Sequence, residues 1–222
     1  MFKHLEIDYP SLSRETIDGV RYYDTPDGKK LVSITSVISH HNREIFTKWR
    51  KRVGVDEANK ITKAATSRGT DMHTLTEHYL LNQKLPSVQP LSEFLFKQAK
   101  PTLEKIDNIH AIEQSLFSKQ LGVAGTVDCI AEYDGVLSII DFKTSTKERS
   151  DSWNENYYIQ GSAYAEMFEE RTSIPVQQVV ILVVTEDGTV QEFVKDKEEY
   201  LPLLEQAVAD FTQKEQESAK TN

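Results

Sequence analysis

The feature that most restricts how this 222-residue chain can fold is a hairpin of two apolar strands around Asp134-Gly135. An Asp-Gly pair favours a two-residue β-turn, because both positions of such a turn need positive φ. It separates the segment Gly125–Tyr133 from the run Val136–Lys143, and both segments are rich in strand-forming residues. The turn predicts an antiparallel pair in which Tyr133 faces Val136.

Continuing that register along the two strands brings Asp128 directly across from Asp141. Facing residues of an antiparallel pair have Cβ atoms about 4.5–5.5 Å apart. Side chains alternate along a strand, so Lys143 lies on the same face as Asp141. Two facing carboxylates repel, and an uncompensated charge in an apolar strand is costly. We therefore expect compensation by a shared proton, by the lysine, or by a divalent cation held between the two.

The types of side chain indicate which cation would bind. Hard oxygen donors without cysteine favour Mg²⁺ or Mn²⁺ over zinc. The one cysteine, Cys129, excludes a disulfide within the chain and any four-cysteine zinc or iron–sulfur site. Its place in an apolar strand predicts a buried side chain. The alternative is a solvated Asp–Lys–Asp cluster, which the apolar run Val136–Ile140 disfavours.

The rest of the sequence predicts a mixed sheet flanked by helices, an α/β class. Turn signals at Asp18-Gly19 and Asp27-Gly28 predict short strands near the start. Helical patterns follow over 35–83, interrupted at Gly54 and Gly69. Further helices are expected at 91–106, 156–169 and 199–214, and strands at 113–118, 125–133, 136–143, 176–185 and 189–194. We interpret 1–222 as one domain, with a helical arch or lid over 35–106 and a core over 109–214.

Short motifs in a fixed order give the chain a family resemblance. Asp128 followed by Asp141-Phe142-Lys143 resembles the signature of PD-(D/E)xK nucleases in the RecB-type form. Four more segments resemble that form, in order along residues 68–164: Arg68–His73 with Glu77, Glu113, Gly125–Asp128 and Gln160–Tyr164. The motifs are similar in particular to those of the mitochondrial genome maintenance exonucleases and their phage-encoded relatives. The resemblance implies a restriction-endonuclease-like core.

The resemblance also implies a set of metal ligands. Asp128, Asp141, His73 and the backbone carbonyl of Phe142 would hold one or two Mg²⁺ or Mn²⁺ ions, with Glu113 as a further candidate. Taken without the family, His73 is more typical of a core or capping histidine, and Glu113 of an ordinary strand residue.

Three further roles follow from the resemblance. Lys143 would activate the attacking water, because a neighbouring cation lowers the pKa of that water. Gln160 and Tyr164 are four apart on one helix face and would orient the lysine or the substrate phosphate. Glu77 shares a face with His73 and would support it. A surface glutamine beside a core tyrosine is the alternative for the Gln160 pair.

The net charge of −9 disfavours nucleic acid as a partner, yet the charge is unevenly distributed. Residues 41–68 hold eight basic and three acidic side chains, whereas 186–222 hold four basic and ten acidic. Within 46–52 aromatic and cationic residues alternate, which suits single-stranded nucleic acid. Solvated helix faces beside a buried aromatic stripe are the alternative. The residues we expect to contact DNA are Arg68 first, then Lys48, Trp49, Arg50, Arg52, Thr144 and Ser145.

Together these patterns predict a metal-dependent deoxyribonuclease that hydrolyses phosphodiester bonds. The resemblance favours exonuclease action on single strands or ends in DNA repair or recombination, with replication or recombination proteins as partners. A structure-selective endonuclease and a nuclease-like protein that only binds nucleic acid are the alternatives. The sequence shows no long apolar span and no targeting signal. We therefore expect no membrane association and a cytoplasmic location in a bacterium or a phage-infected cell.

Overall fold

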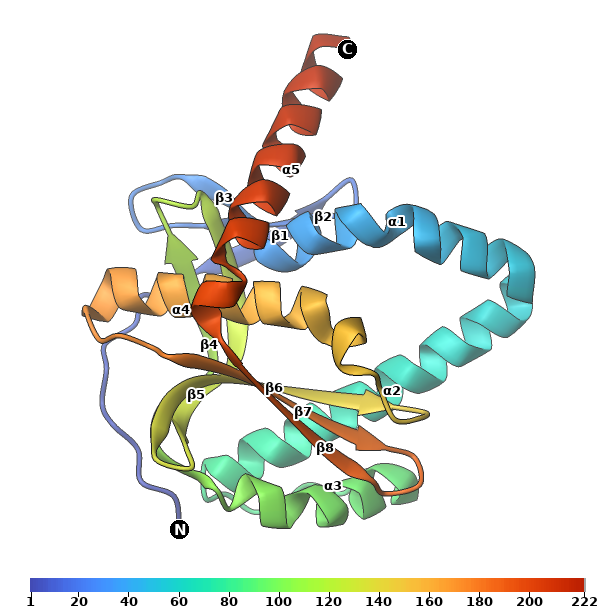
Figure 1. Cartoon of the computed structure of the whole chain (residues 1–222), viewed down its shortest axis with the longest axis vertical. Helices are drawn as coiled ribbons and strands as arrows, with labels where there is room; N and C mark the ends of the chain where they lie inside the picture. Colours follow the sequence, from blue (N-terminus) through green and yellow to red (C-terminus); the bar gives the residue numbers. More distant parts are fainter. Residues whose placement is uncertain (222) are drawn as a thin grey trace.

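The structure is a computed structural model that describes the backbone of residues 1–221 and the side chains of residues 1–39 and 45–217 (Figure 1). The side chain of Arg43, one of the eight basic residues in 41–68, lies outside the described residues. None of the described helices has a stretch long and apolar enough to cross a membrane.

One mixed sheet contains the strands of the described chain. They are β1 Ser13–Ile17, β2 Val20–Asp24, β3 Lys30–Ser33, β4 Ile106–Ser118, β5 Val123–Tyr133, β6 Val136–Ser145, β7 Gln178–Thr185 and β8 Val190–Asp196. Their order is β1-β2-β3-β5-β6-β7-β8, and β4 pairs with β5 outside this path. The pairs β3–β5 and β6–β7 are parallel and the others antiparallel. The predicted mixed α/β fold is confirmed.

Five α-helices and two short 3₁₀ helices complete the described fold. They are α1 Ile34–Val53, α2 Val55–Leu80, α3 Pro90–Leu103, α4 Glu155–Thr172, α5 Leu201–Thr221, η1 Asp151–Asn154 and η2 Lys197–Glu199. Gly54, with φ 92°, separates α1 from α2 as predicted, because this φ favours glycine. Gly69 was wrongly expected to interrupt a helix and lies inside α2. A helical glycine costs only about 1 kcal/mol, which packing can offset.

One strand is longer than its sequence pattern indicates. The strand expected at 113–118 begins at Ile106, and the helix expected to reach that residue ends at Leu103. The strand includes Asn108, with φ 45°, and its pairing to β5 shifts between Asp107 and Ala111. This irregularity explains why residues 106–112 do not alternate cleanly in sequence.

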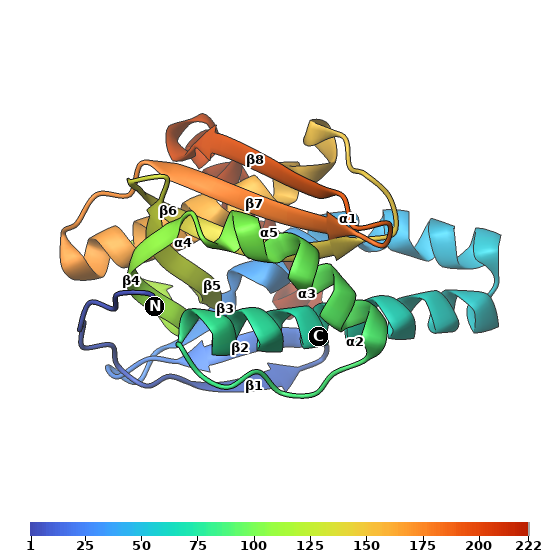
Figure 2. The same cartoon turned by 90° about the horizontal axis from the view of Figure 1, so that it is seen from below.

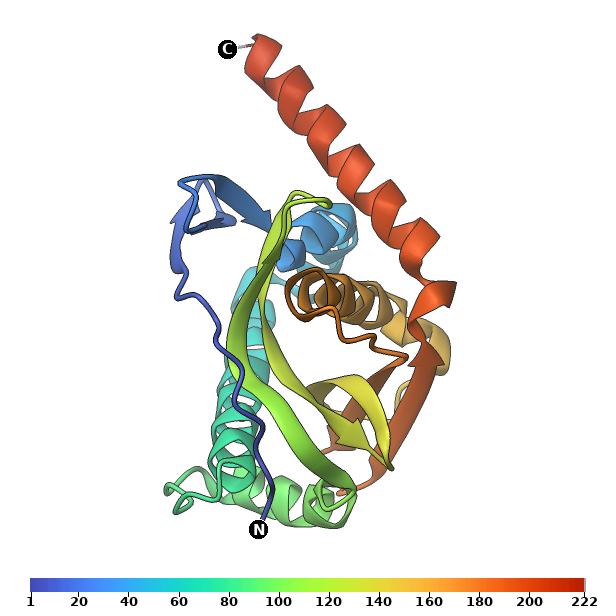
Figure 3. The same cartoon turned by 90° about the vertical axis from the view of Figure 1, so that its left-hand side faces the viewer.

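Helices cover both faces of the sheet, as Figures 2 and 3 show. On one face α4 packs with α1 and α5, and the core there includes Ile34, Phe168 and Leu204. On the other face α2 and α3 pack over Ile140 and Leu182. Away from the sheet, α1 and α2 continue as a pair that extends to one side of the molecule (Figure 1).

Two glycines bring α4 close to the sheet. A Cβ on Gly161 of α4 would lie 2.3 Å from Cγ1 of Val179 in β7. A Cβ on Gly125 of β5 would lie 2.7 Å from Cε1 of Tyr164. Only glycine fits at such an approach of helix and strand. The two positions therefore fix the height of α4, and of Tyr164, above the sheet.

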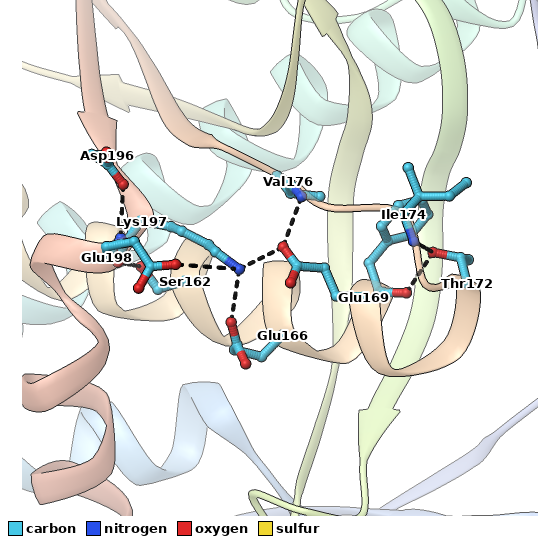
Figure 4. Close-up of polar contacts among 10 residues, drawn as sticks. Ser162, Glu166, Glu169, Thr172, Ile174, Val176, Asp196, Lys197 and Glu198 are labelled. Carbon is cyan, nitrogen blue, oxygen red and sulfur yellow. Dashed lines mark hydrogen bonds and ion pairs between the residues drawn. The ribbon is translucent and has the colours of Figure 1, made fainter.

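A buried lysine joins the C-terminal part of the chain to α4 (Figure 4). The Nζ atom of Lys197 lies 2.9 Å from Glu166 and 2.5 Å from Glu169, and its backbone carbonyl accepts a hydrogen bond from Ser162. Only 6% of Lys197 is exposed, while both glutamates reach solvent. Removing one partner of a buried pair leaves charge without compensation.

We expect Lys197→Ala to lower the free energy of unfolding by about 3 kcal/mol, because Glu166 and Glu169 then face each other without a cation. Urea denaturation followed by circular dichroism measures the change. Lys97→Ala is the matched control, since Lys97 forms an exposed ion pair with Glu93 within one helix. Equal stabilities of the two variants would contradict this role for Lys197.

Candidate active site

The site begins where β5 and β6 separate. The two strands pair from Tyr133–Val136 to Cys129–Ile140, which confirms the predicted register. Beyond that point β5 pairs instead with β3, at Val123 and Ala124. The next step of the register would join Asp128 and Asp141, and both lie at this fork.

Asp128 uses its side chain where the backbone pairing stops. Its Oδ2 atom accepts a hydrogen bond from the backbone N–H of Phe142, at 3.0 Å. On the other side of β5, the pairs Ile112–Cys129 and Gln114–Val127 place Glu113 across from Asp128. Carboxylates from three neighbouring strands therefore follow one another across the sheet.

Glu113 has an unusual backbone for a strand residue. Its φ is 46°, in the left-handed region that non-glycine residues seldom adopt. Ala111 and Leu116 lie on either side of it and belong to the same core cluster, although they are five positions apart and residues on one face of a strand normally differ by an even number of positions. The alternation of side chains between the two faces of the sheet is therefore interrupted around Glu113. Such strain concentrates at functional sites, where the surrounding structure holds it in place.

The helix α2 brings a histidine to these carboxylates. His73 Nδ1 lies 3.5 Å from Glu113 Oε1 and 3.6 Å from Asp128 Oδ2. One ligand atom from each of the three residues falls within 4.8 Å of the others, as in a metal site. Burial alone would lower the pKa of His73, but the charge of Asp128 and the contact with Glu113 raise it to about 8.

Asp141 contacts the lysine rather than this three-residue group. Lys143 Nζ lies 2.5 Å from Asp141 Oδ2 and 4.0 Å from Asp128 Oδ2. Burial raises the pKa of Asp141 to about 6, against the opposing effect of Lys143. Burial would lower the pKa of Lys143, yet the charges of the two aspartates raise it. The lysine therefore stays positively charged.

The predicted pair on α4 lies together above the fork. Gln160 Nε2 donates to Tyr164 Oη at 3.0 Å and to Thr35 Oγ1 of α1 at 3.1 Å. Burial raises the pKa of Tyr164, and the charges of Asp128 and Asp141 add to the effect. The phenol therefore remains protonated beside the carboxylates.

Sequence reasoning missed Tyr157 and Thr35. The Nζ atom of Lys143 lies 5.0 Å from the centre of the Tyr157 ring, within the range of a cation–π contact. Tyr157 precedes Gln160 by three residues and Tyr164 by seven, so helical spacing alone places all three on one face. Thr35 lies 125 residues from its partner, and no local signal identifies it.

The residues expected to contact DNA lie in three different settings. Arg68 is buried and forms an ion pair with Glu186 in the β7–β8 turn, so its charge is already partnered. On α1, Phe46 stacks on Trp49, and the guanidinium of Arg50 lies 5.9 Å from the Phe46 ring. Phe46 is 47% exposed, so this group is no buried stripe.

The positions of the remaining predicted side chains do not test the roles predicted for them. On α1, Lys48 and Arg52 are exposed. Thr144 and Ser145 are half-buried at the end of β6, and Glu77 lies one turn after His73 on α2. Their roles remain predictions. Cys129 is fully buried, as expected from its strand.

Comparison with protein families shows to which family the chain belongs. The model of the PD-(D/E)XK nuclease superfamily matches residues 91–220, more than half of the chain. The chain belongs to this superfamily. The resemblance in the sequence motifs is thereby confirmed, and membership of a nuclease superfamily supports a hydrolase. Nucleases of this superfamily use divalent metal ions, and the site offers the carboxylates such ions bind.

Curated relatives are similar over part of their length. Mitochondrial genome maintenance exonuclease 1 from Homo sapiens is 25% identical over 157 residues, which is 65% of this chain and 45% of that protein. The Mus musculus protein is 25% identical over 152 residues, covering 64% and 45%. The Xenopus tropicalis protein is 26% identical over 152 residues, covering 64% and 44%. The matched region thus spans less than half of these relatives.

A solved structure from Eubacterium rectale, described as "Putative exonuclease", is also similar. Its TM-score is 0.45 at 15% identity, and the match covers 64% of each chain.

Metal affinity at this site is expected to depend on pH. His73 must be neutral to donate to a cation, and its pKa without metal is about 8. Between about pH 6 and pH 8 the affinity for Mn²⁺ should therefore rise about tenfold per pH unit, and then level off. Isothermal titration calorimetry measures this dependence. His73→Gln should make the Mn²⁺ affinity nearly independent of pH. A pH-independent affinity in the unaltered protein would contradict His73 as a metal ligand.

Proposed function

We propose that the chain is a deoxyribonuclease that needs Mg²⁺ or Mn²⁺ and removes nucleotides from single-stranded DNA or DNA ends. The observation that carries the proposal is the convergence of Asp128, Asp141 and Lys143 with His73 and Glu113 where β5 and β6 separate. Superfamily membership supports the hydrolysis of phosphodiester bonds. The relatives named exonucleases support the choice of exonuclease action.

The donor set fits a divalent cation. His73, Glu113 and Asp128 bring one nitrogen and two carboxylates together, and Asp141 with the Phe142 carbonyl would complete the set. Carboxylate-rich sites favour Mg²⁺ or Mn²⁺. When bound, the cation supplies positive charge that polarises the scissile phosphate and makes an attacking water more acidic.

Lys143 is the residue we assign to the attacking water. Its ammonium group is held by Asp141 and lies near Asp128, while the Tyr157 ring limits its movement on another side. A fixed positive charge stabilises negative charge that builds up on the attacking oxygen and on the phosphate during the reaction. Because Asp141 is buried, water has little access to its carboxylate, and Lys143 remains its partner.

Gln160 and Tyr164 are proposed to position the substrate. The Gln160 amide is fixed by hydrogen bonds to Thr35 and Tyr164, and it therefore presents its remaining atoms in a constant direction. Positioning of this kind lowers the barrier, since the reacting groups no longer need to be ordered. The group of exposed Phe46 with half-buried Trp49 and Arg50 on α1 supports a partner with unpaired bases.

The decisive assay compares end-labelled linear and circular single-stranded DNA, each with Mg²⁺ and with chelator. We expect the linear strand to be degraded, the circle to stay intact, and chelator to stop the reaction. An opened circle would indicate an endonuclease. Binding of both strands without cutting of either would indicate a binding protein, as in the alternative from the sequence.

Replacing the lysine tests the assigned chemistry. We expect Lys143→Ala to lower kcat by about 100-fold or more, because the charge that stabilises the transition state is lost. Lys147→Ala is the control, since Lys147 is an exposed lysine four residues further along the chain. Circular dichroism verifies that both variants fold. Cutting at an unchanged rate by a folded Lys143→Ala protein would refute the assignment.

A further inference from the structure

The geometry points to a base-binding subsite: the pocket between α1, η1 and the start of α4 holds one unpaired base of the DNA strand, next to the scissile phosphate. This inference rests on the proposed function and adds the residues that recognise a single strand. The pocket measures about 290 Å³ and is lined by Thr35, Arg149, Trp153, Asn156, Tyr157 and Gln160, among others. That volume is at the small end for ligand sites.

The pocket adjoins the catalytic groups through two shared side chains. Tyr157 lines the pocket, and the same ring lies 5.0 Å from Lys143 Nζ. Gln160 also lines it and donates to Tyr164. A strand whose phosphate lies at Lys143 therefore has its neighbouring base within reach of the pocket.

The side chains suit a base with a phosphate attached. Trp153 is 65% exposed, and among the described residues its ring stacks on no other aromatic ring. An exposed indole is a platform on which any base stacks. The amide of Asn156 and the carbonyl oxygen of Gln160 can pair with the polar edge of that base.

Arg149 is held ready to contact a phosphate. Its Nε donates to Asn154 at 2.7 Å and its Nη2 to the Trp153 carbonyl at 2.6 Å. Its guanidinium lies 5.3 Å from the Tyr157 ring that also faces Lys143. Among the described residues Nη1 has no acceptor, so both of its N–H groups remain for the DNA backbone. Lys143 and Arg149, both beside the Tyr157 ring, would supply positive charge to successive phosphates of the strand.

Recognition by stacking in a pocket requires an unpaired base. In a duplex each base is covered by its neighbours and must leave the helix to enter a pocket, which costs energy. The subsite therefore gives a physical reason for a preference for single strands, which the carboxylates and the lysine alone do not supply.

Trp153 can report on the pocket directly, because the chain has two tryptophans. Trp49→Phe leaves Trp153 as the one tryptophan, and Trp153→Phe leaves Trp49. Each protein is titrated with a single-stranded oligonucleotide in chelator, so that no strand is cut. We expect the emission of Trp153 to fall on binding, and to change little with a blunt duplex of the same sequence. Unchanged emission of Trp153 on saturation with single strands would overturn the inference.

An abasic oligonucleotide tests the stacking itself. Trp153→Ala should weaken binding of the single strand about tenfold, within the range for one stacked base. Replacing one base at a time with an abasic unit should reveal one position where the unaltered protein loses a similar factor and Trp153→Ala loses nothing further. Trp153→Phe should recover most of the affinity. Phe94→Ala changes an exposed aromatic of α3 outside the pocket and should bind as the unaltered protein does.

The outcomes separate the two proposals. If the unaltered protein cuts single strands while Trp153→Ala binds them equally well, the subsite is refuted and the proposed function stands. If the unaltered protein neither cuts nor binds single strands, both are refuted. A Trp153→Ala protein that loses binding equally at every abasic position would also refute the subsite, since the loss would not come from one base.

Discussion

The crowding of negative charge at the fork of β5 and β6 is the constraint on which the rest of this site depends. Glu113, Asp128 and Asp141 come from neighbouring strands, and Asp141 is only 6% exposed. Facing carboxylates repel, and burial penalises each charge further. Lys143 and a protonated His73 offset part of this cost, yet the pKa of Asp141 still rises to about 6. The site therefore favours further positive charge, which a divalent cation would provide.

The site forms where the backbone pairing of β5 and β6 ends and a side-chain hydrogen bond takes its place. Where β6 separates from β5, the Phe142 N–H is satisfied by the Asp128 carboxylate instead of a backbone carbonyl, which keeps that side chain at the fork. Above it, Gly125 and Gly161 allow α4 to approach the sheet, so that groups on α4 reach the same place. The cost of charge and strain is met by the large apolar clusters on both faces of the sheet.

The parts of the site that were predictable from sequence are those fixed by local geometry. The turn at Asp134-Gly135 determines the register of β5 and β6. That register places Asp128 near Asp141, which is only 13 positions further along the chain. The backbone of Glu113 was not predictable, because its positive φ reflects surroundings rather than residue type. Contacts such as Arg68–Glu186 and Thr35–Gln160 join residues more than 100 apart, and only the folded chain brings them together.

The ion pair of Arg68 also bears on how an acidic chain could hold the proposed DNA substrate. A count of basic residues over 41–68 suggests a cationic surface, but the charge of Arg68 is buried against Glu186. At long range, phosphates and a protein of net charge −9 repel each other, and salt screens this repulsion. In the proposed function, binding would then come from short-range contacts, namely a cation at the carboxylates, Lys143, and stacking on exposed rings such as Trp153. Stacking is open only to unpaired bases, so a dependence on short-range stacking supports the proposed preference for single strands.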